Sequence, residues 1–137
     1  MLATLFKFRG GVKPASHKDE STHAPIARAP LPSRLVVPLR QSAGGMPQPL
    51  VTAGQQVLKG ERIGAPAGNF SAAIHAPTSG TVRAVESRML PHPSGLSALC
   101  VVIEPDGEER WIERVPVNYA AESPDALRDL LRDSGVV

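Results

Sequence analysis

The sequence predicts a small protein made mainly of β-strands, and three observations support this prediction. The 137 residues include 14 prolines and 12 glycines, a composition that favours short strands and ordered loops over long helices. Between residues 51 and 82, β-branched residues alternate with glycines in two motifs, V-x-x-G-x-x-V-x-x-G and A-P-x-S-G-x-V. Residues 98–103 (ALCVVI) form a continuous apolar run, as in a strand buried on both faces.

Length and composition indicate one globular domain with appendages, because 137 residues with 42% hydrophobic side chains fit a single core. Cys100 is the only cysteine, so an intramolecular disulfide is excluded and no C-x-x-C pair exists for zinc or iron–sulfur ligation. The apolar run at residues 1–6 is shorter than the ~7 to 15 residues of a signal-peptide core. No stretch approaches the ~20 apolar residues that span a bilayer. We therefore expect membrane association only through partners.

Charge is distributed unevenly along the chain. The net charge of +2 combines +5 in residues 1–40, +2 in residues 41–100 and −5 in residues 101–137. This polarity is compatible with docking on a partner or an anionic surface, but the favoured interpretation is a solvated surface whose two ends neutralise each other. Nucleic-acid binding is not expected, because the chain has only three Phe, one Trp and one Tyr, and no basic run interleaved with aromatic residues.

The first segment, residues 1–34, is predicted to be an extended arm. It has no sustained strand or helix periodicity, and four prolines interrupt any regular element, with one short strand expected around Leu5 to Phe8. Residues 35–39 (LVVPL) follow as a strand. Pro38 cannot donate a backbone hydrogen bond, which confines this strand to a sheet edge or to a strand end.

The predicted barrel body, residues 35–118, continues through further short strands. Glycines and apolar residues place these strands near residues 49–52, 61–65, 71–76 and 80–87. After the apolar run at 98–103, Pro-Asp-Gly at 105–107 predicts a turn into residues 109–114, so these two segments are expected to form a hairpin.

The last segment, residues 119–137, contains a predicted amphipathic helix at 124–134. Ser123 is a suitable N-cap, Pro124 suits the first helical position, and Gly135 ends the helix. Leu127, Leu130 and Leu131 fall on one face. Because so short a helix is marginally stable alone, we expect it to dock on this barrel or on a domain outside the chain.

No catalytic or metal-binding constellation stands out in the sequence. The four histidines are scattered, and the spacing of His17 and His23 permits a metal without implying one. Cys100 lies in an apolar run and is expected to be a buried, inert thiol. The pairs Gly10-Gly11 and Gly44-Gly45 lack the spacing of phosphate-binding loops and are explained by turns.

The two glycine motifs resemble the biotinyl/lipoyl-type barrel-sandwich hybrid. Domains of that type usually carry a cofactor on a lysine at the tip of the hairpin between the two motifs. Here residues 69–73 (NFSAA) occupy the tip and contain no lysine, and Lys59 belongs to the turn of the first motif. A degenerate carrier domain therefore remains only a minor alternative, and a free-standing barrel that binds a small ligand or a partner is a second alternative.

Four strings resemble one family, the RnfC proteins of the Rnf electron-transport complex. They are FRGGVKP at 8–14, PLV followed by the glycine motif at 49–60, APTSGTV at 76–82, and HPSGL followed by CVVIEPDGEERW between 92 and 111. The resemblance covers nearly the whole chain and implies a barrel-sandwich hybrid with an N-terminal arm and a short C-terminal helix.

The resemblance also implies a function for the parent protein. RnfC is a peripheral subunit on the cytoplasmic side of the bacterial inner membrane, in a complex that couples NADH and ferredoxin electron transfer to ion translocation. Its FMN- and NADH-binding domain and the cysteines of its two 4Fe–4S clusters follow the region that resembles this chain. We therefore expect a domain without a cofactor or an active site of its own, docked on the flavin domain and on other Rnf subunits.

The residues expected to matter are structural rather than catalytic. Glycine and proline supply the backbone conformations that turns require. Three residues would fix the turn of the arm and four would fix the corners of the barrel: Gly10, Gly11 and Pro14 in the arm, and Gly54, Gly60, Pro77 and Gly80 in the barrel. Substitution of Gly80 by valine is expected to unfold the barrel, because positive φ is expected there.

Overall fold

The computed structural model describes residue 11, residues 14–68 and residues 70–137. The chain divides into two units, residues 1–30 and 31–137, and each is considered by itself. In the first unit, helix α1 (Asp19–Thr22) is a single turn. Asp19 and Glu20 lie at its start, where acidic side chains interact favourably with the positive end of the helix dipole. None of its residues is buried. The strand predicted around Leu5 to Phe8 lies outside the described residues.

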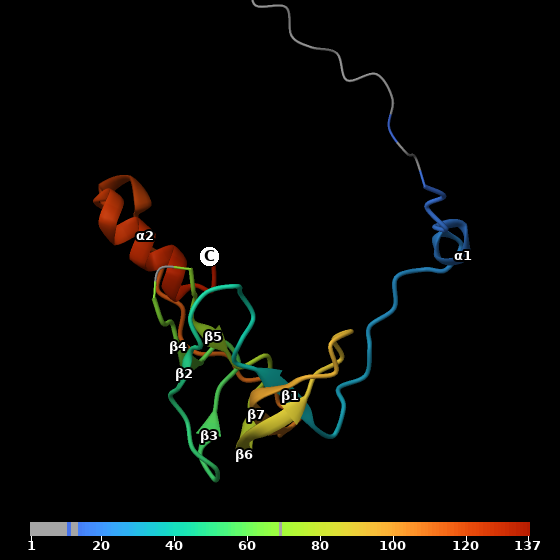
Figure 1. Ribbon diagram of the computed structural model, residues 1–137. Coiled ribbons are helices and arrows are strands. Elements are labelled where there is room, and N and C mark those ends of the chain that lie inside the picture. The colour runs from blue at the N-terminus through green and yellow to red at the C-terminus, as the bar shows by residue number, and fades with distance from the viewer. Residues whose placement is uncertain (1–10, 12–13, 69) are drawn as a thin grey trace, which may run out of the picture. The chain divides into compact units, whose positions relative to one another are not determined.

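The second unit contains two antiparallel sheets, which confirms the prediction of a mainly β protein (Figure 1). The larger sheet has the order β1–β7–β6–β3, with β1 at one edge. Pro38 therefore lies in an edge strand, as predicted. The four strands are β1 (Leu35–Pro38), β7 (Ser97–Pro105), β6 (Gly80–Met89) and β3 (Gln56–Val57).

The smaller sheet has the order β2–β4–β5. Its strands are β2 (Gln48–Pro49), β4 (Arg62–Ala65) and β5 (Ile74–His75). The core consists of β-branched and other aliphatic side chains contributed by strands of both sheets and by the adjoining residues. These core residues are Val37, Leu39, Val51, Val57, Ile63, Ile74, Ala76, Val82, Val101 and Ile103.

The hairpin predicted between 98–103 and 109–114 is wrong. Strand β7 pairs with β1 along one edge and with β6 along the other, so neither edge is left for residues 109–114. The turn itself is present, with Gly107 at a φ of +80°. The chain leaves the sheet after this turn, and Trp111 makes an isolated parallel bridge with Lys59 instead.

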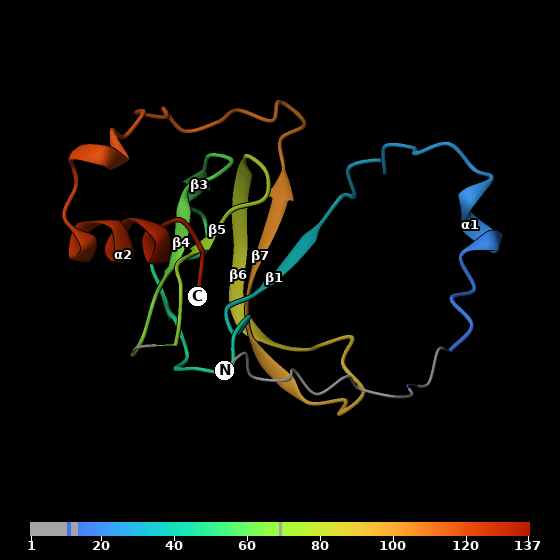
Figure 2. The same cartoon turned by 90° about the horizontal axis from the view of Figure 1, so that it is seen from above.

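Strands β6 and β7 form the longest hairpin of the described structure. Their pairing runs from Gly80 opposite Pro105 to Met89 opposite Ser97, with a register shift between Val82 and Ala84. The hairpin therefore extends beyond β1 and β3, which pair only with its proximal part. Its loop, residues 90–96, projects at the same end of the barrel as residues 40–47 and 66–70, at the lower edge of Figure 2.

The C-terminal helix α2 (Pro124–Asp133) forms as predicted and follows a short 3-10 turn, Tyr119–Ala121. The Ser123 side chain caps the first turn by accepting the backbone N–H of Ala126 at 3.2 Å. Gly135, at a φ of +89°, ends the helix in the left-handed conformation that glycine adopts without strain.

Candidate functional site

The histidines and the cysteine are the first side chains to consider for a chemical site. No set of three or more His, Cys, Asp or Glu residues in the described part of the chain lies close enough to hold a metal ion. His75 lies on β5, and His92 lies in the loop between β6 and β7. Cys100 is fully buried, and this burial raises the pKa of its thiol, which disfavours the reactive thiolate.

The three glycines singled out in the barrel have two kinds of structural role. Gly54 and Gly60 take φ values of +92° and +83° in turns, where a side chain would be strained. Gly80, the first residue of β6, has a φ of +158°, which agrees with the predicted positive φ. An added Cβ there would lie 2.1 Å from the carbonyl oxygen of Glu104, so the close approach of the β7 backbone also requires glycine at position 80.

The remaining residues singled out from the sequence are at the surface or outside the described part. Pro77 is exposed and lies between the buried residues Ala76 and Thr78. In the arm, Gly11 and Pro14 are exposed, and Gly10 lies outside the described residues. That these arm residues fix a turn stays a prediction.

The A-P-T-S-G motif holds the acidic segment that follows β7. The buried Thr78 donates its hydroxyl to Glu109 at 2.7 Å. The buried Ser79 donates its hydroxyl to Asp106 at 2.7 Å and accepts the backbone N–H of Arg110 at 2.9 Å. All three partners lie in the segment after β7, so these two hydroxyls fasten residues 106–110 to the start of β6. Their role is structural, since they are satisfied inside the protein.

Low pH should weaken the hydrogen bonds that Asp106 accepts. Hydrogen bonds from Arg110, Ser79 and the Glu108 backbone lower the pKa of Asp106 from 3.8 to about 2. A folded-state pKa below the unfolded value gives stability that is present above the unfolded pKa and lost as pH falls through the folded one. We expect Asp106 to contribute to a fall in melting temperature between about pH 4 and pH 2. In Asp106→Asn that fall should be smaller, and an unchanged pH profile would contradict the assignment.

Lys59 is held in place rather than presented to solvent. Its ammonium forms an ion pair with Glu109 and lies 5.2 Å from the centroid of the Trp111 ring. The guanidinium of Arg114 stacks on the same ring at 3.5 Å. Lys59 therefore holds Glu109 and Trp111, in the segment that follows β7, against the barrel. The lysine lies before β4 and away from the β4–β5 hairpin tip, residues 66–73.

Helix α2 packs against this hairpin tip and lies beside β4 and β5 in both views (Figures 1 and 2). The guanidinium of Arg132 donates to the carbonyl oxygen of Ser71 at 3.1 Å and also to that of Gly68. The Arg132 carbonyl accepts the N–H of Ala73 at 3.0 Å, and Asp133 pairs with Arg62 at 2.8 Å. Of the two docking alternatives from the sequence, the helix contacts this barrel, and it binds the backbone of Gly68, Ser71 and Ala73 in the loop that carries the cofactor lysine in carrier domains.

Removing the Arg132 side chain should loosen the helix. Charge-assisted hydrogen bonds contribute about 1.5 to 3 kcal/mol, so Arg132→Ala is expected to destabilise the chain by about this amount and to speed amide exchange in α2. Arg128→Ala is the matched control, because Arg128 is an exposed arginine of the same helix that pairs with Asp125. Its effect should stay below about 1 kcal/mol. Equal unfolding curves for the two variants would contradict the role of Arg132.

Apolar side chains at the C-terminal end of the helix remain exposed. Leu131 is 52% exposed, and Val136 and Val137 beyond the helix are also exposed. These residues line a surface hollow of about 720 Å³ together with Ser71 and with four charged residues of the helix, Asp125, Arg128, Asp129 and Arg132. The helix therefore contacts the barrel through its last turn and leaves several apolar side chains exposed.

A second exposed apolar stretch precedes the helix. Residues 112–118 form no strand, and every residue from 113 to 120 is exposed, including Val115, Val117 and Tyr119. We name the exposed apolar residues of this part of the chain the C-terminal surface: Trp111, Val115, Val117, Tyr119, Leu130, Leu131, Val136 and Val137.

Comparison with known proteins identifies the barrel. A family model described as the RnfC barrel sandwich hybrid domain matches residues 6–108, three quarters of the chain. The chain belongs to this family. The two curled sheets agree with that description, which confirms the barrel-sandwich hybrid expected from the glycine motifs.

Curated relatives extend the similarity over nearly the whole chain. The C subunit of the ion-translocating oxidoreductase complex of Pseudomonas aeruginosa is 47% identical over 136 residues, which is 98% of this RnfC-family chain and 18% of the relative. The corresponding proteins of Vibrio cholerae and Serratia proteamaculans are 41% and 39% identical over 133 residues. The chain thus spans about a fifth of the length of these relatives. No helix in its described part is long and apolar enough to cross a membrane.

Several important contacts of this RnfC-family barrel leave little signal in the sequence. Arg132 is by pattern an ordinary charged residue near a helix end, and its contacts with Gly68 and Ser71 depend on tertiary structure. Turns alone do not explain the pair Gly44-Gly45, because an added Cβ at Gly44 would lie 1.8 Å from the carbonyl oxygen of Phe70. A double glycine outside a phosphate-loop pattern was the available signal for such a close approach.

Proposed function

We propose that this chain is a non-catalytic docking and structural domain at the N-terminus of an RnfC protein. Its family and the names of its relatives support a place in an ion-translocating oxidoreductase complex. In the proposed setting, the complex couples electron transfer between NADH and ferredoxin-type carriers to ion translocation. The RnfC protein would lie peripherally on the cytoplasmic side of the bacterial inner membrane.

The distribution of exposed apolar side chains carries this proposal. Large apolar residues of the C-terminal surface are exposed from Trp111 to Val137, beyond the residues that the family model matches. The relatives are about five times longer than this chain, and in them this surface would be followed by further polypeptide. Exposed apolar patches on a well-packed domain mark interaction surfaces. We infer that the C-terminal surface packs against the flavin-binding domain that follows in the family.

The cofactors of the parent would belong to other parts of the RnfC protein. Two 4Fe–4S clusters need several cysteine thiolates, whereas this chain has one buried cysteine. The residues of this chain therefore do not fit an iron–sulfur cluster. FMN and NADH are likewise assigned to the following domain, and the barrel would hold that domain in position.

The arm, residues 1–34, would contact neighbouring subunits of the complex. Its described residues are exposed, including Ile26. A segment with exposed apolar residues and several prolines loses less conformational entropy on binding than a flexible chain does. In this proposal Gly10, Gly11 and Pro14 would set the turn of the arm.

Amide hydrogen exchange tests the proposed docking. Residues 111–137 should exchange more slowly in the intact RnfC protein than in the 137-residue chain alone. Leu131→Glu should remove this protection without lowering the melting temperature of the barrel, because Leu131 is half exposed. Thr52→Glu, an exposed change in the turn before β3, is the control. Equal exchange in the chain and in the intact protein would refute the proposal.

A further inference from the structure

Three loops form one end of the barrel, which we name the loop end: residues 40–47, residues 66–68 with Phe70, and the β6–β7 loop at 90–96 with Met89 at its start. The first two loops are packed backbone to backbone. Ser42 donates its hydroxyl to the Phe70 carbonyl at 3.0 Å, and an added Cβ at Gly45 would lie 2.3 Å from the carbonyl oxygen of Ala67. These contacts need glycine at both positions 44 and 45, so the pair of glycines brings the two loops together.

The third loop adjoins the first across a hollow of about 520 Å³. Residues 40–43 line one side of the hollow, and residues 90–98 line the other. Within the third loop, Ser94 donates its backbone N–H to His92 at 3.2 Å, and Gly95 donates to the His92 carbonyl at 2.9 Å. The three loops therefore lie at the same end of the barrel, and the first loop contacts each of the other two (Figure 2).

Large apolar side chains are exposed on this surface. Phe70, Met89 and Leu96 are 73%, 75% and 70% exposed, and Met46 of the first loop is also exposed. None of them lies in the C-terminal surface. Phenylalanine and methionine are enriched at protein interfaces, and methionine adapts its shape to a partner.

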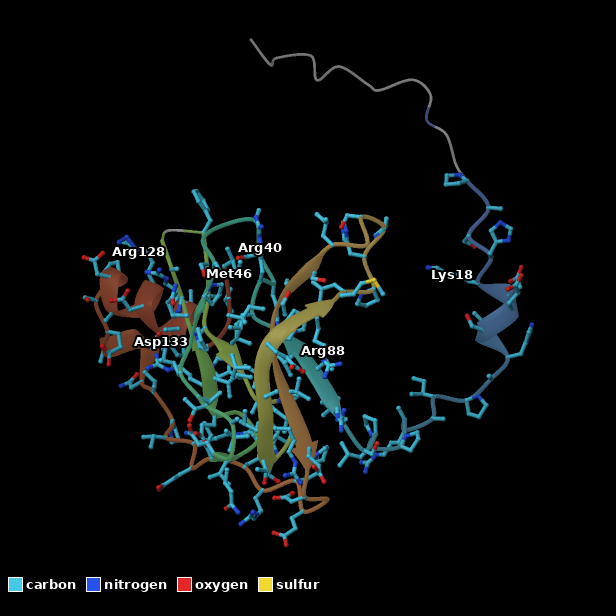
Figure 3. The ribbon with its side chains drawn as sticks, turned by 60° about the horizontal axis from the view of Figure 1, so that its bottom comes forward. Lys18, Arg40, Met46, Arg88, Arg128 and Asp133 are labelled. Atoms are coloured by element: carbon cyan, nitrogen blue, oxygen red, sulfur yellow. The ribbon has the colours of Figure 1, made fainter. Side chains whose placement is uncertain are left out.

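The loop end also lacks negative charge. Between residues 31 and 103 the chain has only two carboxylates, Glu61 and Glu86. Glu61 accepts the backbone N–H of Leu58, and Glu86 pairs with Arg88. Arg40 lines the hollow and makes no ion pair with any described residue. Arg40 and Met46 are labelled in Figure 3. A carboxylate from outside the barrel would complement Arg40.

We propose that the loop end binds an acidic, apolar segment of another subunit. A carboxylate of that segment pairs with Arg40, and its apolar side chains pack on Met46, Phe70 and Leu96. The inference rests on the proposed function only in placing the chain within a complex. It adds a second interface, remote in sequence from the one that would face the following domain.

Two other occupants fit the surface less well. An anionic membrane attracts a protein with about 1 kcal/mol per basic residue, and among the described residues the loop end offers a single unpaired arginine. The acidic segment 104–133 of a second copy would give a head-to-tail contact, which generates open filaments unless the rotation closes a ring. A segment of a different subunit satisfies both the charge and the apolar surface.

Site-specific photo-crosslinking in the assembled complex tests this inference. A benzoylphenylalanine at position 70 should form an adduct with an acidic segment of another subunit, mapped by mass spectrometry. The same probe at Thr52, in an exposed turn before β3, should give no such adduct. Arg40→Gln should lower the yield at position 70 about tenfold, the effect of losing about 1.4 kcal/mol. Arg83→Gln, which removes an exposed arginine of β6, should leave the yield within about twofold.

The opposing outcomes are distinct. Adducts with lipid would assign the loop end to the membrane surface, and adducts confined to the same RnfC protein would assign it to an internal contact. Either result overturns the inference, as does an absence of adducts at position 70. The proposed function is judged separately, by exchange protection of residues 111–137, so failure of one leaves the other standing. Unchanged melting temperatures of the Arg40 and Arg83 variants exclude unfolding as the cause.

Discussion

Replacement of Gly80 by valine should leave the chain largely unfolded. The added Cβ would lie 2.1 Å from the Glu104 carbonyl oxygen and 2.9 Å from the Pro105 Cα, both backbone atoms that cannot rotate away. Relief of the clash requires β6 and β7 to separate at the start of their pairing, beside the buried residue Val82. Overpacking alone costs about 1 to 3 kcal/mol, and loss of the strand pairing adds to it. A small domain is stabilised by only about 5 to 15 kcal/mol in total, so the combined cost of overpacking and lost strand pairing is a large part of its stability.

Circular dichroism and urea unfolding would measure the effect. Gly54→Ala is the matched control, since Gly54 also has positive φ but an added Cβ there would meet no atom within 4 Å. Its cost should be about 1 kcal/mol, from backbone strain alone. If the valine variant at position 80 melts within error of the wild type, the close strand pairing at Gly80 is refuted.

Substitution of Ile103 by alanine should cost about 2 to 5 kcal/mol of unfolding free energy. Ile103 is fully buried in the central strand β7, where it pairs with Leu35 of β1 and Val82 of β6. Truncation leaves a cavity that cannot collapse easily, because both neighbouring strands are held by backbone hydrogen bonds. Ile103→Val removes one methylene and should cost about 0.5 to 1.5 kcal/mol.

Urea denaturation of the two variants would give these values with little change in the slope of the transition. Leu96→Ala provides a surface comparison, and its effect should remain within about 0.5 kcal/mol because Leu96 is largely exposed. A loss of less than about 1 kcal/mol in Ile103→Ala would mean that β7 does not form the centre of the core.

Much of the fold could be predicted because local chemistry and tertiary structure agree. The apolar run at 98–103 became the central strand β7, which has neighbours on both edges and a buried stretch at residues 100–103. Pro38 confined β1 to an edge, and Ser123 with Pro124 set the start of α2. In each case one residue type excludes alternatives by its own backbone or capping preference.

The missed features depend on which edges and surfaces remain free after folding. Residues 109–114 have a good turn before them, but β1 and β6 already occupy both edges of β7. Glycine is equally ambiguous, because it serves a positive φ at Gly60 and a close backbone approach at Gly44. The contacts of Arg132 and those of the loop end join segments that are tens of residues apart in the sequence. No periodic pattern in the local sequence indicates such contacts.

The fastening of α2 to the hairpin tip has a mechanical consequence. In a carrier domain, the hairpin tip bears the cofactor and can move it between distant sites. Here Arg132 and Asp133 tie the last turn of the helix to the tip and to β4, so Val136 starts from a fixed position on the barrel. In the longer relatives, a domain that follows would be held at a constant spacing and orientation. The same barrel architecture would then fix the position of a neighbouring domain instead of moving a cofactor.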